Sequence, residues 1–296
     1  MKNKLSLFAV PYVGWMSIFV VAPIIIMVVD AFSTAAGDFT LENFARMGTY
    51  TAVFTRSFKL AIIATLIALL IGYPVSYMLS KEGPQVQRIA MVLIMLPMWM
   101  NFLLRTYSWM SNLENNGLLN QLFQQIGLID LYNQIAMHFA SDPAAYVPID
   151  HFQMIGTQGA VVLGMVYNYL PFMILPIYSV LVKLDRSLVE AAADLGANPI
   201  TCFVKVVLPQ SVPGIISGIT MVFIPAITTF AISRLLGGGK FLLYGDLIEN
   251  QFITLGQSAW PVGSALSFIL LILVLLSMAV MRRAERDSGD EGGMLW

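Results

Sequence analysis

Charge and cysteine are both scarce in this chain. Lys, Arg, Asp and Glu make up only 11% of its 296 residues, whereas soluble domains carry about 25%. The net charge of −1 provides no field that would attract nucleic acid, so we expect no nucleic-acid partner. The one cysteine, Cys202, excludes an internal disulfide framework.

Patterns of catalytic or metal-binding residues are also missing. His138 and His151 stand apart from cysteine and from clustered carboxylates, so we expect no metal site. No nucleophile and base recur at a spacing that would bring them together, so we expect no catalytic residue. These absences argue against a membrane-embedded enzyme.

Long apolar runs dominate the chain instead. Hydrophobic residues make up 58% of it, and the mean hydropathy is +0.77. Six runs approach the length of about 20 residues that a membrane-spanning helix needs. They are 8–29, 58–79, 88–110, 158–181, 210–233 and 261–281. We therefore predict an all-α polytopic helix bundle with six transmembrane helices in a lipid bilayer.

The first run is preceded by Lys2 and Lys4, as in a signal peptide. It is longer than a signal-peptide core of about 7–15 residues, which favours an uncleaved first helix. The small residues at 33–36 leave cleavage open as the alternative.

The distribution of Lys and Arg predicts the orientation, because cytoplasmic segments carry more of them. With the N-terminus inside, ten lie on the inner side: Lys2, Lys4, Lys81, Arg88, Lys183, Arg186, Lys205, Arg282, Arg283 and Arg286. Six lie on the outer side: Arg46, Arg56, Lys59, Arg105, Arg234 and Lys240. Both termini are then cytoplasmic.

A polar segment between two apolar runs, residues 187–209, is called the hinge below. Ser187 and Glu190 match a capping box, in which each side chain accepts a free N–H at a helix start. Gly196 suits the left-handed conformation that ends a helix. Asn198 and Pro199 are typical of the start of a second helix.

The spacing within the hinge matches a known motif. Glu190-Ala191-Ala192 is followed after three residues by Gly196, after nine more by Val206, and then by Leu208-Pro209. It resembles the EAA loop of binding-protein-dependent ABC importer permeases, with Val206 in place of isoleucine. The resemblance implies the type I permease fold and a coupling helix that docks on a cytoplasmic ATPase. The residues implied in coupling are Glu190, Ala191, Ala192, Asp194, Gly196, Leu208 and Pro209. The alternative is that Glu190 only caps a helix and Gly196 only ends one.

A wider resemblance covers about residues 5–283. It rests on Leu96-Pro97 through Tyr107, Tyr169-Leu-Pro171 through Tyr178, Lys183 through Glu190, and Trp260-Pro261. Together these segments resemble the spermidine/putrescine importer permeases of the bacterial cell membrane. The resemblance implies a dimer of ATPase subunits that binds ATP and Mg²⁺, with no cofactor in this chain. It also implies a second homologous permease and an extracytoplasmic substrate-binding protein.

The expected organisation follows from this resemblance. Residues 1–56 form an N-terminal helix and outer loop, 57–283 the permease domain, and 284–296 a cytoplasmic tail. Within the permease domain, Gly214 and Gly218 of the fifth run allow close helix approach, and Pro225 allows a kink.

A flexible polycation would suit aromatic walls with carboxylates nearby. The candidate pathway residues are Trp99, Tyr107, Tyr167, Tyr169, Thr228, Thr229, Phe230, Asp246 and Glu249. Aromatic residues also form belts at membrane interfaces, which is the simpler interpretation of each. Arg105 and Arg234 should repel a polyamine, so we expect them to pair or to reach the headgroups.

Two outer segments complete the prediction. Apolar residues at helical spacing between Leu118 and Ile129 predict an interfacial helix, which could also contact the binding protein. Gly237-Gly238-Gly239-Lys240 lacks the pattern of a phosphate loop and is predicted as a turn. Two alternatives to the polyamine importer stay open: an ABC permease for another small organic solute and an ion-coupled secondary transporter, although acids within the spans are sparse.

Overall fold

The protein is described here from a computed structural model, which covers residues 11–139 and 146–293. In that part of the chain all regular secondary-structure elements are helices. The β-structure there is confined to one isolated bridge, between Ser33 and Phe39. Five helical segments are long and apolar enough to cross a membrane: Pro11–Ala31, Glu42–Lys81, Gln158–Leu181, Pro199–Thr228 and Gln257–Arg283. A bent pair of helices provides a sixth candidate.

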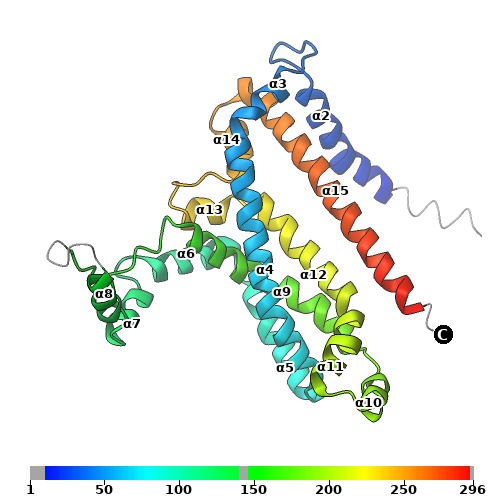
Figure 1. The fold of residues 1–296 in the computed structure, drawn as a ribbon. Helices are drawn as coiled ribbons and strands as arrows, with labels where there is room; N and C mark the ends of the chain where they lie inside the picture. Colours follow the sequence, from blue (N-terminus) through cyan, green and yellow to red (C-terminus); the bar gives the residue numbers. More distant parts are fainter. Residues whose placement is uncertain (1–10, 140–145, 294–296) are drawn as a thin grey trace, which may run out of the picture.

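Three long helices form the centre of the bundle (Figure 1): α4 (Thr51–Lys81), α9 (Gln158–Leu181) and α12 (Leu208–Thr228). Their shared core includes the fully buried Leu60, Met165 and Ile177. The glycines of α12 allow it to approach α9 closely, as predicted. A Cβ on Gly214 would lie 2.9 Å from the Pro176 carbonyl oxygen, and one on Gly218 would lie 3.2 Å from that of Met173. Such close packing holds helices together where lipid surrounds the protein.

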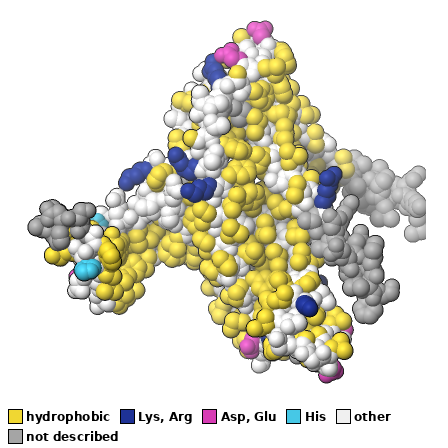
Figure 2. Space-filling view, viewed as in Figure 1, with side chains coloured by type: hydrophobic (Ala, Val, Ile, Leu, Met, Phe, Trp, Pro, Cys, Tyr) yellow, Lys and Arg dark blue, Asp and Glu magenta, His cyan; other side chains and the backbone are white. Residues whose placement is uncertain are grey.

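Two further helices form an arm beside this centre. Figure 1 shows α2 (Ala22–Ala31) lying along α15 (Trp260–Gly293), and the pair diverges from α4 and α9. Ring contacts of Phe32 with Phe44 and Phe268, at centroid distances of 4.9 and 5.6 Å, join the end of α2 to α15 and to α3 (Glu42–Ala45). Figure 2 shows hydrophobic side chains over most of the visible face, with acidic side chains at its two ends, as a lipid-facing surface requires.

The predicted span 88–110 is not one continuous helix. The chain runs through α5 (Pro84–Met95) and the short η3 (Leu96–Trp99), then turns by 91° into α6 (Phe102–Leu113) and α7 (Leu118–Gln125). The backbone is extended at Met100, and the Asn101 side chain starts α6 by accepting from Leu103 N at 2.8 Å. Arg105 closes the bend, since its Nη1 donates to the Pro97 carbonyl oxygen at 2.7 Å.

The outer stretch contains two helices rather than the single interfacial helix that we expected. Gly127, at φ +73°, separates α7 from α8 (Leu128–Phe139). Two asparagines fasten this pair to the following loop. Asn120 exchanges hydrogen bonds of 3.0 and 2.9 Å with the Phe152 backbone, and Asn133 exchanges bonds of 2.8 and 2.9 Å with that of Ile149.

The two ends of the chain are described only in part. Lys2 and Lys4, which the predicted orientation uses, lie outside the described residues. The predicted tail at 284–296 begins inside α15, which continues to Gly293.

Candidate coupling hinge and substrate cavity

The first hinge helix, α10 (Arg186–Asp194), begins two residues earlier than a cap at Ser187 predicts. Asp185 is its N-cap and accepts from Ser187 N at 2.9 Å. The backbone N–H and the hydroxyl of Ser187 hold the pKa of this exposed carboxyl below its usual value. The predicted capping box of Ser187 and Glu190 is therefore wrong, because Asp185 takes the N–H bond and places Ser187 inside the first turn.

Gly196 ends α10 in the left-handed conformation that the sequence predicts, with φ +83°. Ala197 N donates to Ala192 O at 3.1 Å, and Gly196 N donates to Ala193 O at 2.9 Å. This pair of bonds is the Schellman motif, which satisfies carbonyls that the helix end would otherwise leave free.

The second hinge helix, α11 (Pro199–Cys202), starts as predicted. Asn198 is its N-cap and accepts from Thr201 N at 2.7 Å, with Pro199 in the first position. The chain continues through η5 (Phe203–Val207) directly into α12, which has Pro209 in its first turn. A displacement of the hinge would therefore be transmitted along the backbone to a central helix of the bundle.

Replacing Asn198 by alanine removes this cap. We expect α11 to lose about 1 kcal/mol of stability, which accelerates amide hydrogen exchange at Thr201 about fivefold. Asn198→Asp keeps an acceptor at the same place and should exchange at close to the original rate. Equal exchange rates in the alanine variant and the original protein would contradict the assigned cap.

The hinge exposes large apolar side chains. Leu195 is 90% exposed and Ile200 is 75% exposed, whereas Val189 and Phe203 pack against the core. Glu190, Ala191, Asp194, Gly196 and Pro209 are also exposed, and Ala192 and Leu208 are half-buried. Leu195 and Ile200 are not among the predicted coupling residues, because helical periodicity does not show which apolar residues find a partner within the chain.

A cavity of about 310 Å³ lies beneath α10 and includes Glu190, Tyr77, Lys81 and Gln87 among its lining residues. Lys81 Nζ lies 4.0 Å from the centre of the Tyr77 ring. Gln87 accepts from the Tyr178 hydroxyl at 3.0 Å. Glu190 therefore lies where α10 meets α4 (Thr51–Lys81) and α5 (Pro84–Met95).

The second candidate region is the break after α12. The helix continues through Pro225 to Thr228, and Thr229 is extended before α13 (Ala231–Leu236). Pro225, where a kink is predicted, therefore lies three residues before the end of this helix. The start of α14 (Tyr244–Ile253) packs against this break, where a Cβ on Gly245 would collide with Thr228 O and lie 2.6 Å from Thr229 O.

A cavity of about 520 Å³ lies beside the break. It is the candidate site for substrate and is called the substrate cavity below. It brings together three of the predicted pathway residues, Thr228, Phe230 and Glu249. Residues of α2, α12, α14 and α15 supply most of the remaining wall: Ile24, Met27, Ile224, Gly245, Ile248, Ser267, Leu270, Leu271 and Val274. Arg234 forms an ion pair with Glu249, which is one of the arrangements that the sequence analysis expected for this cation.

Asp246, also expected along the pathway, does not line this cavity. It is 2% exposed and accepts from the Ser233 hydroxyl at 2.6 Å and from Leu243 N at 2.9 Å. Burial raises the pKa of this carboxyl, against the lowering effect of those two bonds. Asp246 therefore joins the start of α14 to α13.

The other predicted aromatic residues are divided between the bend of α5 and α6 and the end of α12. Tyr167 packs against Trp109 and lies 5.9 Å from the buried Arg105 guanidinium. The Tyr169 hydroxyl donates to the Pro225 carbonyl oxygen at 3.4 Å. Trp99 and Tyr107 are 77% and 48% exposed. These side chains and Thr229 are not among the lining residues of the substrate cavity.

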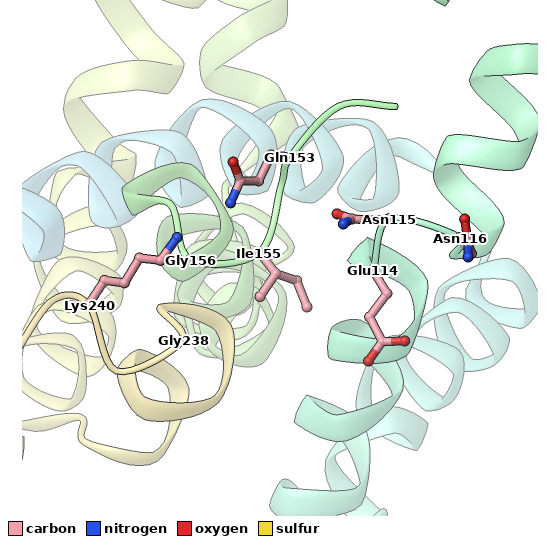
Figure 3. A pocket seen from close by; sticks show the side chains of 8 residues that line it. All are labelled: Glu114, Asn115, Asn116, Gln153, Ile155, Gly156, Gly238 and Lys240. Atoms are coloured by element: carbon pink, nitrogen blue, oxygen red, sulfur yellow. The ribbon is translucent and has the colours of Figure 1, made fainter. Parts of the chain in front are cut away.

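A third cavity, of about 500 Å³, is polar and lies among the loops near α7 (Figure 3). Glu114, Asn115, Asn116, Gln153 and Lys240 line it, together with Ile155, Gly156 and Gly238. Lys240 extends from the predicted glycine turn toward Gly156, and Gly238 and Gly239 both have positive φ. Among the side chains that the structure describes, no group of three or more His, Cys, Asp or Glu could hold a metal ion.

Comparison with known proteins identifies relatives along almost the whole chain. Residues 68–288 match the family described as binding-protein-dependent transport system inner membrane component. The spermidine/putrescine transport system permease protein PotB of Haemophilus influenzae is 36% identical over 294 residues, which cover 96% of each chain. The protein of the same name from Escherichia coli is 36% identical over 285 residues, which cover 94% of this chain and 96% of the relative.

Solved structures show the same fold at lower identity. A chain of a bacterial ABC transporter involved in the import of the acidic polysaccharide alginate has a TM-score of 0.69 at 17% identity, covering 95% of this chain and 96% of that one. A chain of the MetNI methionine ABC transporter in an inward-facing conformation has a TM-score of 0.55 at 18% identity, covering 82% of this chain and 98% of that one.

Proposed function

The chain belongs to the family of binding-protein-dependent transport system inner membrane components, and we propose that it is the permease subunit of an ATP-driven ABC importer for spermidine and putrescine. Identity of 36% to polyamine permeases over nearly the full length of both chains supports this substrate class. The bundle of membrane-spanning helices agrees with a role in the inner membrane.

The observation that carries the mechanism is the exposed hinge. Two short helices with defined ends present Leu195 and Ile200 to solvent, and an exposed apolar pair beside charged residues suits a docking surface. We propose that this surface binds a cytoplasmic ATPase, which holds ATP and Mg²⁺. Closure of the ATPase dimer would displace the hinge and, through η5, switch α12 between two arrangements of the bundle.

Two further partners follow from the same proposal. A second homologous permease completes the substrate pathway, and an extracytoplasmic binding protein docks on the polar cavity of Glu114, Gln153 and Lys240. One neighbouring structure is of an alginate transporter in complex with a periplasmic protein bound to an alginate pentasaccharide, which supports a partner of this kind. Both termini of this chain then lie in the cytoplasm.

Another small organic solute is the second candidate cargo. Arg105 favours it, because this cation is 8% exposed and its described contacts are a carbonyl group and the Tyr167 ring rather than a carboxylate. Such a charge would repel a polyamine that passed nearby. Binding of labelled solutes to the partner binding protein distinguishes the two cargoes, since polyamine binding supports the first and its absence the second.

Cross-linking tests the docking surface. In a Cys202→Ala background, Ile200→Cys labelled with benzophenone maleimide should photo-cross-link to the ATPase subunit in membranes. Ile253→Cys is the matched control, because Ile253 is 73% exposed and Ile200 is 75% exposed, and Ile253 lies at the far end of the bundle. Cross-linking from residue 253, or its absence from residue 200, would contradict the docking role.

A further inference from the structure

The ion pair at the substrate cavity is asymmetric. Arg234 of α13 contacts Glu249 of α14 with its two terminal guanidinium nitrogens, and the Nη1 to Oε1 distance is 3.2 Å. The arginine side chain is 49% exposed, whereas the glutamate side chain is 19% exposed. The acid is therefore the more buried member of the pair, and the base is the more exposed one.

Only the acid belongs to the cavity. Among the described residues that line it, Glu249 is the one charged side chain, and Arg234 is not among them. The nearest wall is apolar, with Ile248 and Phe230, and Thr228 adds a hydroxyl. The cavity therefore offers one carboxylate, one aromatic ring and hydrocarbon surface.

This combination matches the chemistry of a polyamine, in which ammonium groups are joined by methylene chains. An ammonium group would bind the carboxylate by a charge-assisted hydrogen bond and the ring by a cation–π contact, while the methylenes would cover apolar surface. An empty cavity would leave Glu249 partly desolvated and without a counter-charge, which is costly. Arg234 supplies that counter-charge.

We infer that Arg234 is an internal counter-ion of Glu249, which an ammonium group of the entering polyamine displaces. The net charge around Glu249 is the same before and after the exchange. The carboxylate therefore has a positively charged partner both when the polyamine is bound and when it has left. Competition from Arg234 also lowers the affinity of the cavity, as release to the other side of the membrane requires. Glu249 then contacts the substrate, and Arg234 acts through Glu249. The inference rests on the proposed function.

Exchanging the two charges separates this role from a structural one. The assembled importer, with its ATPase, second permease and binding protein, is reconstituted in proteoliposomes, and half-saturation by labelled spermidine is measured. Glu249→Gln should raise the half-saturating concentration about tenfold or more, because it removes a charge-assisted bond. Arg234→Gln should lower it about two- to fivefold, the range for loss of an exposed ion pair.

The double variant Arg234→Glu, Glu249→Arg keeps an ion pair but moves the carboxylate out of the cavity. It should have the same thermal stability as the original importer. Its half-saturating spermidine concentration should be as high as that of Glu249→Gln. Exchanging the exposed pair Glu42 and Arg46, which lie 3.0 Å apart in another part of the fold, is the matched control and should change neither value.

The outcomes distinguish a failure of the counter-ion role from a failure of the proposed function. Normal spermidine uptake by the 234/249 double variant would show a purely structural pair and overturn the inference alone. Weaker binding by Arg234→Gln would overturn it in the same way. An original complex that imports neither spermidine nor putrescine would overturn the proposed function and, with it, this inference.

Discussion

Replacing Gly196 with valine is expected to uncouple ATP hydrolysis from transport while the chain still inserts into the membrane. Gly196 has φ +83°, where a β-branched residue is strongly disfavoured. The substitution should break the Schellman bonds and tilt α11 relative to α10. Since strain of this kind costs about 1–3 kcal/mol, we expect uptake in membrane vesicles to fall at least tenfold.

Gly127→Val is the matched control for this prediction. Gly127 also has a positive φ, +73°, and neither glycine has other atoms within 4 Å of an added Cβ. The two substitutions therefore impose similar backbone strain in different turns. Equal losses of uptake in both would attribute the effect to general destabilisation, and normal uptake in Gly196→Val would contradict the coupling role.

The second large effect is expected at Asp246. Asp246→Ala removes the acceptor of the Leu243 N–H at the start of α14, in a region where Leu243 and Ser233 are fully buried. The Ser233 hydroxyl can still donate to the Phe230 carbonyl oxygen, which lies at 2.8 Å, so one buried donor is left without a partner. An unpaired buried donor costs about 1–3 kcal/mol of folding free energy. This cost should appear as a lower thermal midpoint of the purified protein in detergent.

Asp246→Asn tests whether the hydrogen bond or the charge matters. The amide oxygen can still accept from Leu243 N, so this variant should be markedly more stable than Asp246→Ala. A substrate-binding role would give the opposite pattern, in which Asp246→Asn weakens transport and both variants leave the thermal midpoint unchanged.

Local features of the hinge could be predicted from sequence because single residues determine them. Gly196 and Asn198 each have a backbone role that few other residues perform, and the structure confirms both. The start of α10 was predicted incorrectly because Asp185 and Ser187 are both good N-caps within two residues, and the sequence does not decide which of them accepts the N–H.

Features that depend on packing were harder to predict. Hydropathy identifies the run 88–110 but not its bend, which requires Arg105 to bind the Pro97 carbonyl oxygen. Asp246 and Glu249 are both acids on α14, and only the packing against α13 shows that the first is buried and the second lines the cavity. Periodicity alone could not show that Leu195 and Ile200 stay exposed in this chain.

We propose, above all, that ATP hydrolysis by a partner ATPase docked on the hinge drives polyamine import through this chain. It is tested most directly by labelled spermidine uptake into proteoliposomes that contain the whole complex. We expect uptake to require ATP, the ATPase subunit and the binding protein, and to persist when a protonophore collapses the proton gradient. Uptake that continues without the ATPase and stops with the protonophore would contradict the account and identify an ion-coupled transporter.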